Sequence, residues 1–319
     1  MKRIGLVLSG GGGKGAYHIG VWKALREFGV EQNVNAVAGT SVGALNAALF
    51  LQGNLEVAEK VWLQISPEKI LTPNPKNIIA QALKYVPSPL TQIFAKFSGK
   101  IVGHGWFSRA GLLKIIRGDV DLSKVSTSPI TTFSTCLNAR TLKVEYFPLN
   151  YQEREKIESI LLASSAIPFL FDAEKIEGVP YWDGGFPYFG DNIPIQPLYD
   201  HGCDFIFVIH LNQSEMIDVK KYPKAQIVEI VPQDSQGGFI NGTLDFTPSG
   251  SRRRMEQGYQ DTIRILNPIF DMASTQLNVA NRLYKLKASE LSFNAKRREL
   301  LNERAEFKNE THRLLEDMS

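Results

Sequence analysis

The chain has 319 residues, of which 43% are hydrophobic and 22% are charged, and its formal net charge is +3. This composition is typical of a folded globular protein, and the mild, unclustered positive charge argues against a nucleic-acid partner. Two cysteines, Cys136 and Cys203, offer no disulfide framework, so we expect a cytoplasmic protein that needs neither a metal nor another cofactor. The apolar run at residues 4–8 is too short for a signal peptide, and no run is long enough to span a bilayer.

The chain begins with that strand-like run, which breaks into a glycine-rich loop at residues 9–15. Gly10, Gly12 and Gly15 have the G-x-G-x-x-G spacing of a dinucleotide-binding loop. A dinucleotide site also needs an acidic residue at the end of the next strand to hold the ribose, but here that strand runs into Gly39-Thr40-Ser41. The loop therefore fits a dinucleotide poorly.

Two other interpretations of the loop assign different roles to Lys14. A phosphate-binding P-loop fails, because Lys14 is followed by Gly15 where a serine or threonine should bind magnesium. An anion cradle fits better, because the amides of Gly11, Gly12 and Gly13 can point together at one oxygen while Lys14 adds positive charge. Such donors stabilise the oxyanion that forms during acyl transfer.

A second apolar run, residues 35–38, ends in Gly39-Thr40-Ser41-Val42-Gly43 and is followed by helix-forming residues 44–51. Gly-x-Ser-x-Gly between a strand and a helix is the pattern of a nucleophile elbow, a sharp turn relieved by glycines on both sides of the serine. Ser41 would stand at the helix N-terminus, where free amides favour negative charge. The pentapeptide alone is also compatible with an ordinary strand-to-helix turn.

A serine nucleophile needs a base, and the candidate is Asp183 within Tyr181-Trp182-Asp183-Gly184-Gly185. The flanking aromatic residues would raise its pKa above the ordinary value of about 3.9. An isolated Asp-Gly-Gly is usually a plain turn, so Asp183 counts only together with the other two motifs. A Ser-His-Asp triad is the alternative, and its chain order leaves His201, His210 and His312, of which His210 ends a predicted strand.

In this order the three motifs resemble those of the patatin-like phospholipases, and further similarity extends to about residue 235. The resemblance implies a Ser-Asp dyad without histidine, in which Ser41 is the nucleophile and Asp183 the base, acting on fatty acyl esters of phospholipids or similar lipids. It places the oxyanion hole at Gly11, Gly12 and Gly13. The remaining motif residues would support these groups: Gly10, Lys14, Gly15, Gly39, Gly43, Gly184 and Gly185.

Strand-like segments alternate with helical ones along the chain, which predicts an α/β fold with three α/β/α layers, a central, mostly parallel sheet and additional C-terminal helices. The clearest helix covers residues 151–165 and ends before Pro168. The predicted strands are residues 3–8, 35–39, 129–137, 142–147, 179–182, 204–210 and 226–231.

We expect a catalytic domain at residues 1–235 and a helical extension at 236–319. Within the first, the proline-rich segment 67–105 is predicted to be an insert that packs on the sheet or forms a lid. In the second, Arg252-Arg253-Arg254 is interpreted as an exposed helix start. Residues 281–318 predict one or two long helices with a nearly seven-residue apolar repeat, which we expect to pack within the protein or in a homo-oligomer because their charges are mixed.

The sequence therefore predicts a cytoplasmic serine acyl hydrolase that contacts membrane surfaces transiently and takes a phospholipid or another lipid ester as its substrate. Two alternatives stay open. One is a nucleotide-binding regulatory protein that uses residues 10–15 and shows no serine-dependent turnover. The other is an inactive lipid-binding homologue, which would bind vesicles without hydrolysing them.

Overall fold

The computed structural model describes residues 2–73, 107–168 and 170–316. It divides into two compact units, residues 1–264 and 265–319, and each is described by itself. The boundary predicted at residue 235 between a catalytic domain and a helical extension concerns function and stays a prediction. Most of the predicted insert at 67–105, with His104, lies outside the described residues.

The first unit is built on a mixed sheet with the strand order β10-β9-β1-β2-β5-β8-β7, to which β6 is added beside β5. Strands β10, β9, β1, β2 and β5 run parallel, while β6, β8 and β7 join antiparallel. Each of the seven predicted strands is present, and the mostly parallel sheet is confirmed. The strands are β1 (Ile4–Leu8), β2 (Val34–Thr40), β5 (Thr131–Asn138), β6 (Val144–Pro148), β7 (Glu174–Ile176), β8 (Val179–Asp183), β9 (Phe205–Ile209) and β10 (Gln226–Ile230). A separate short pair joins β3 (Thr72–Pro73) to β4 (Phe107–Ser108).

The pairing of β5 explains how distant parts of the chain meet. The first half of β5 pairs with β2, and Thr135 lies opposite Thr40. The second half pairs with β8, and Cys136 lies opposite Asp183. Because β6 occupies the other edge of β5 across both halves, β2 and β8 share one edge and abut end to end. The residue that follows β2 and the residue that ends β8 are therefore brought together.

Helices cover both faces of the sheet in the pattern expected of an α/β fold. On one face, Val7 and Val208 pack with Leu198 of α10. On the other face, Leu6 and Ile209 lie against α1 and α2, as the alternation of side chains along a strand requires. The helices of this unit before α11 are α1 (Ala16–Glu27), α2 (Val42–Leu51), α3 (Leu55–Gln64), α4 (Pro67–Ile70), α7 (Ala110–Asp119), α8 (Leu122–Thr127), α9 (Arg154–Ser164) and α10 (Gln196–Asp200).

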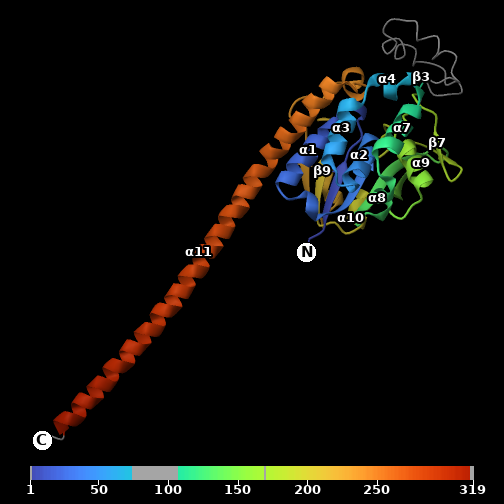
Figure 1. Cartoon of the computed structure of the whole chain (residues 1–319). Coiled ribbons are helices and arrows are strands. Elements are labelled where there is room, and N and C mark those ends of the chain that lie inside the picture. The colour runs from blue at the N-terminus through green and yellow to red at the C-terminus, as the bar shows by residue number, and fades with distance from the viewer. Residues whose placement is uncertain (1, 74–106, 169, 317–319) are drawn as a thin grey trace. The chain divides into compact units, whose positions relative to one another are not determined.

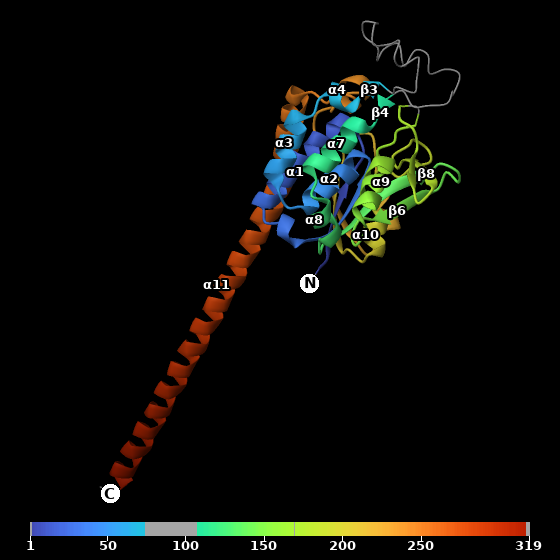
Figure 2. The same cartoon turned by 45° about the vertical axis from the view of Figure 1, so that its right-hand side comes forward.

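Helix α11 (Pro248–Glu316) begins three residues before the predicted start, and its first turns belong to the first unit. Figure 1 and Figure 2 both show this start beside α1. The two backbones nearly touch, because a Cβ placed on Gly20 would lie 1.8 Å from the carbonyl oxygen of Met255, and one on Gly258 would lie 2.2 Å from that of Tyr17. The Tyr17 hydroxyl also donates to Asp261 at 3.0 Å. Glycines on both helices thus permit this close crossing.

The second unit is described to Glu316 and consists of the rest of α11, which contains Pro268. The predicted helix is present, as one continuous element. Its exposed apolar side chains include a set spaced by seven residues: Met272, Val279, Leu286, Phe293, Leu300 and Phe307. In the described parts of the chain, no helix combines the length and apolar character needed to cross a bilayer.

Candidate active site

Ser41 stands in the turn between β2 and α2, in a conformation that side chains seldom adopt. Its φ is 56° and its ψ is −122°, and it caps the N-terminus of α2. Gly39 and Gly43 flank it, and a Cβ on Gly43 would lie 2.0 Å from the carbonyl oxygen of Leu8. The glycines therefore let the helix start directly against β1, and the local geometry is the sharp turn that the Gly-x-Ser-x-Gly pattern predicts.

The hydroxyl of Ser41 donates a hydrogen bond of 2.6 Å to Oδ2 of Asp183. The other carboxylate oxygen, Oδ1, accepts a 2.7 Å hydrogen bond from the amide of Gly185, the second glycine after the strand. Both side chains are buried, with 6% of Ser41 and 5% of Asp183 exposed. The structure thus brings together the two residues that the sequence proposes as nucleophile and base.

The surroundings of Asp183 make it a stronger base than an ordinary aspartate. Burial raises its pKa to about 6, and the hydrogen bonds from Ser41 and Gly185 and the positive charge of Arg109 oppose that rise. Arg109, at the start of α7, forms a 2.5 Å ion pair with Glu174 of β7. At neutral pH Asp183 is therefore mostly ionised yet basic enough to accept a proton in a transition state.

Ser164 holds the turn from behind, and sequence reasoning gave it no role. The backbone amide of Ser41 donates to the Ser164 hydroxyl at 2.9 Å, and this hydroxyl donates to the carbonyl oxygen of Thr135 at 2.7 Å. Ser164 is fully buried at the end of α9. No pattern in consecutive residues indicates this contact, which spans 123 positions of sequence.

The glycine-rich loop lies beside Ser41 and forms the short 3-10 turn η1 (Gly12–Gly15). Gly12 lines the same pocket as Ser41. The hydrogen bond from the Lys14 amide to the Gly11 carbonyl, at 3.3 Å, closes this turn. The amides of Gly12 and Gly13 precede it, so they have no carbonyl partner within the turn and can serve a ligand. This arrangement suits the predicted anion cradle.

Lys14 of this loop is buried and hydrogen-bonded within the fold. Its ammonium group donates to Oδ1 of Asn212 at 2.5 Å. Burial, reinforced by the positive charge of Arg254, lowers its pKa. The bond to Asn212 supports the loop from within, and the positive charge that Lys14 would add to the anion cradle stays a prediction.

Asn192 ties the glycine-rich loop to the turn that follows Asp183. The amide of Gly10 donates to Oδ1 of Asn192 at 3.1 Å. Next to it, the Asp191 amide donates to the carbonyl oxygen of Gly184 at 2.7 Å, and the Thr40 hydroxyl donates to the carbonyl oxygen of Asp191 at 2.8 Å. Sequence reasoning missed Asn192, because a single asparagine carries no recognisable pattern. The three motifs are nevertheless linked through this one short segment.

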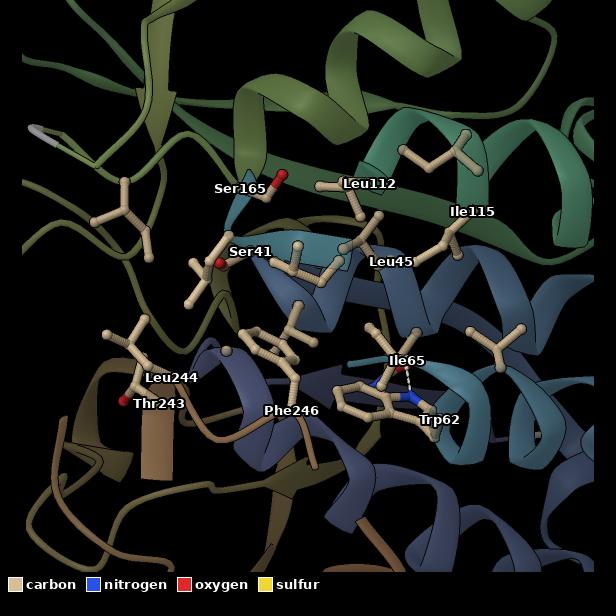
Figure 3. Close-up of a pocket in the computed structure, with 18 of the residues that line it drawn as sticks. Ser41, Leu45, Trp62, Ile65, Leu112, Ile115, Ser165, Thr243, Leu244 and Phe246 are labelled. Carbon is tan, nitrogen blue, oxygen red and sulfur yellow. Dashed lines mark hydrogen bonds between the residues drawn. The ribbon is translucent and has the colours of Figure 1, made fainter. Parts of the chain in front are cut away.

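An apolar pocket opens at Ser41 (Figure 3). Figure 3 shows Leu45 of α2, Trp62 of α3, Leu112 of α7 and Phe246 arranged with Ser41 around the same space. The space is narrow, with a cavity volume of about 80 Å³. A chain of methylene groups is the kind of ligand that such walls favour.

His210, the candidate of the alternative triad that ends a predicted strand, does not line the pocket at Ser41. His210 is fully buried after β9, with its Nε2 2.9 Å from a carboxylate oxygen of Glu229 on β10. Burial lowers its pKa, although the neighbouring Glu229 and Glu215 act in the opposite direction. No histidine of the described residues lines the pocket at Ser41. The structure gives the serine a carboxylate partner instead.

The sequence is similar to several curated proteins. It is 28% identical over 223 residues to the lysophospholipase NTE1 of Cryptococcus neoformans, a match that covers 69% of this chain and 12% of that protein. It is 27% identical over 223 residues to the neuropathy target esterase sws of Drosophila melanogaster, covering 69% and 14%. An uncharacterised NTE family protein of Mycobacterium bovis is 25% identical over 213 residues, covering 67% and 50%. The chain thus spans half or less of the length of these relatives.

The fold is similar to that of a solved structure, and the sequence matches the model of a protein family. VipD from Legionella pneumophila has 16% sequence identity and a TM-score of 0.50, over 84% of this chain and 67% of that one. The model described as patatin-like phospholipase matches residues 6–199, which is more than half of the chain. This chain therefore belongs to the patatin-like phospholipase family.

Proposed function

We propose that this protein hydrolyses the acyl esters of phospholipids or similar lipids, with Ser41 as nucleophile and Asp183 as its base. The observation that carries the proposal is the 2.6 Å hydrogen bond between the two buried side chains, one of which, Ser41, lines an apolar pocket. Membership of a phospholipase family supports the lipid substrate. The relatives named lysophospholipase and esterase point to carboxylic ester chemistry.

The reaction proceeds through an acyl-enzyme. Asp183 accepts the proton of the Ser41 hydroxyl as the oxygen attacks the ester carbonyl carbon, and the amides of Gly11, Gly12 and Gly13 stabilise the resulting oxyanion. When the tetrahedral intermediate collapses, the proton passes from Asp183 to the departing alcohol. A water molecule then gives its proton to Asp183 and attacks the acyl carbon, which releases the fatty acid and restores the serine hydroxyl.

The pocket gives the proposal its substrate class. Its walls hold an acyl chain while the ester carbonyl lies between Ser41 and the glycine amides. Because such substrates reside in lipid aggregates, transient contact with a membrane surface is part of the proposal. A cytoplasmic location and a homo-oligomer formed through the C-terminal helix stay predictions.

The first test compares the wild type with Ser41→Ala on mixed phospholipid vesicles and on lysophospholipid micelles, with released fatty acid quantified by mass spectrometry. Release by the wild type, reduced to background in Ser41→Ala, is the expected result. Equal release by both proteins would remove Ser41 from the mechanism. No release by either would leave the two alternatives, which titration with a dinucleotide and vesicle flotation would then separate.

A further inference from the structure

The glycine-rich loop rests directly on a second loop, residues 236–247, which we call the flanking loop. Gly12 has a φ of +58°, and a Cβ placed on it would lie 2.2 Å from the carbonyl oxygen of Thr243. A Cβ on Gly13 would lie 2.2 Å from the carbonyl oxygen of Asp245. At this separation the two backbones are in contact, so the position of the Gly12 and Gly13 amides depends on where the flanking loop lies.

The flanking loop is held in turn by Arg254, whose side chain is fully buried at the start of α11. Its guanidinium donates to a carboxylate oxygen of Asp245 at 2.9 Å, to the Asp245 carbonyl at 3.2 Å and to the Asn241 carbonyl at 3.2 Å. The neighbours Arg252 and Arg253 are exposed. The expectation that all three arginines form an exposed helix start is therefore wrong for Arg254.

The same loop also shapes the pocket. Thr243, Leu244 and Phe246 line it together with Ser41, and Figure 3 shows Thr243 and Leu244 next to each other on its wall. The flanking loop also contacts α11, through Arg254. The close crossing of α11 with α1 at Gly20 and Gly258 fixes the backbone from which Arg254 extends. A continuous line of contacts thus runs from α11 through Arg254 and residues 241–245 to the glycine amides.

We propose that Arg254 is a positioning residue for the oxyanion hole and acts through residues 241–245 of the flanking loop. This inference rests on the proposed function, because it assigns the amides of Gly12 and Gly13 to the oxyanion. A planar guanidinium can donate to a carboxylate and two carbonyls at fixed angles. The ammonium of a lysine keeps the positive charge but lacks this planar set of N–H donors. Arg254→Lys therefore separates geometry from charge.

The kinetic test compares Arg254→Lys with Arg252→Lys, a matched change at an exposed position of the same helix. On a lipid ester that the wild type hydrolyses, we expect Arg254→Lys to lower kcat roughly 10- to 100-fold, because misplaced oxyanion donors weaken the transition state. We expect its KM to change less than about threefold and its acid limb to stay near pH 6, because Arg254 does not contact Asp183. Arg252→Lys should match the wild type. Unchanged kcat, or a loss confined to KM, would overturn the inference.

A second measurement does not depend on turnover. Hydrogen exchange followed by mass spectrometry should show faster exchange in the peptide covering residues 9–16 of Arg254→Lys, with β9 exchanging as in the wild type. Unaltered exchange at residues 9–16 would contradict the inference even if the protein proved to have no esterase activity. Wild type that equals Ser41→Ala in fatty acid release would instead count against the proposed function alone.

Where Arg254→Lys fails to fold, Asp245→Asn takes its place, because it keeps the size of the side chain and weakens the contact from the other partner. The expected result is the same in direction and smaller in size. A folded Asp245→Asn protein with wild-type kcat and wild-type exchange at residues 9–16 would overturn the inference.

Discussion

Asp183 and His210 are both buried, titratable and placed where a strand ends, yet the structure brings only Asp183 to the serine. Burial drives both toward the neutral form, raising the pKa of the aspartate and lowering that of the histidine. They differ in strand pairing. Asp183 ends β8, which abuts β2 along the edge of β5, whereas His210 follows β9 and faces Glu229 of β10. Sheet topology, rather than residue type, decides which group can serve Ser41.

The largest effect is expected from replacing Asp183, the residue of this pair that contacts Ser41. Asp183→Asn keeps an oxygen for the Gly185 amide but removes the base, so we expect kcat on a soluble p-nitrophenyl ester to fall roughly 10²- to 10⁴-fold. Steady-state kinetics and a thermal melt together check this. A folded variant with near-wild-type kcat would exclude Asp183 as the base.

The pH dependence of kcat/KM tests the raised pKa of Asp183. Because the base must be ionised and its pKa is raised to about 6, kcat/KM should decline about tenfold per pH unit below pH 6 and lie roughly 100-fold under its plateau at pH 4. The measurement is an initial-rate series at constant ionic strength. A profile flat down to pH 4.5 would mean that the carboxylate keeps an ordinary pKa.

Ser164→Ala tests how far the geometry of the elbow depends on its support. The change leaves the buried amide of Ser41 without its acceptor, which we expect to lower the free energy of unfolding by about 1–3 kcal/mol and to reduce kcat by roughly tenfold. Thr262→Ala serves as a control, because that buried hydroxyl bonds the Gly258 carbonyl of its own helix and Thr262 does not line the pocket at Ser41. Equal kcat values in the two variants would show that the support is dispensable.

The smallest effect is expected at His210. His210→Gln removes the imidazole while leaving a polar side chain near Glu229, and we expect kcat to stay within about threefold of the wild type. The same ester assay measures it. A loss comparable to that of Asp183→Asn would revive the histidine-containing triad.

The local parts of the fold and site could be predicted, because glycine-rich turns between a strand and a helix leave a pattern in consecutive residues. The turn at Ser41 and the strand that ends at Asp183 were found in this way, and their catalytic roles stay predictions. Ser164, Asn192 and Arg254 could not be found, because each acts on a backbone group supplied by another part of the fold. A buried arginine and an exposed one look the same in sequence until the packing around them is known.

The raised pKa of Asp183 also lowers the free energy of unfolding in the pH range in which the carboxylate is ionised. The folded chain holds the proton of Asp183 more tightly than the unfolded chain, whose pKa for this group is near the ordinary 3.8. Folding is therefore unaffected by this group below that pKa, becomes less favourable as the pH rises to about 6, and above it carries a penalty of about 3 kcal/mol. At neutral pH the folded protein holds Asp183 mostly in the ionised form that the proposed mechanism needs, so it carries this penalty under the conditions in which the proposed base would act. A substitution of Asp183 that removed this penalty would therefore also remove the proposed base.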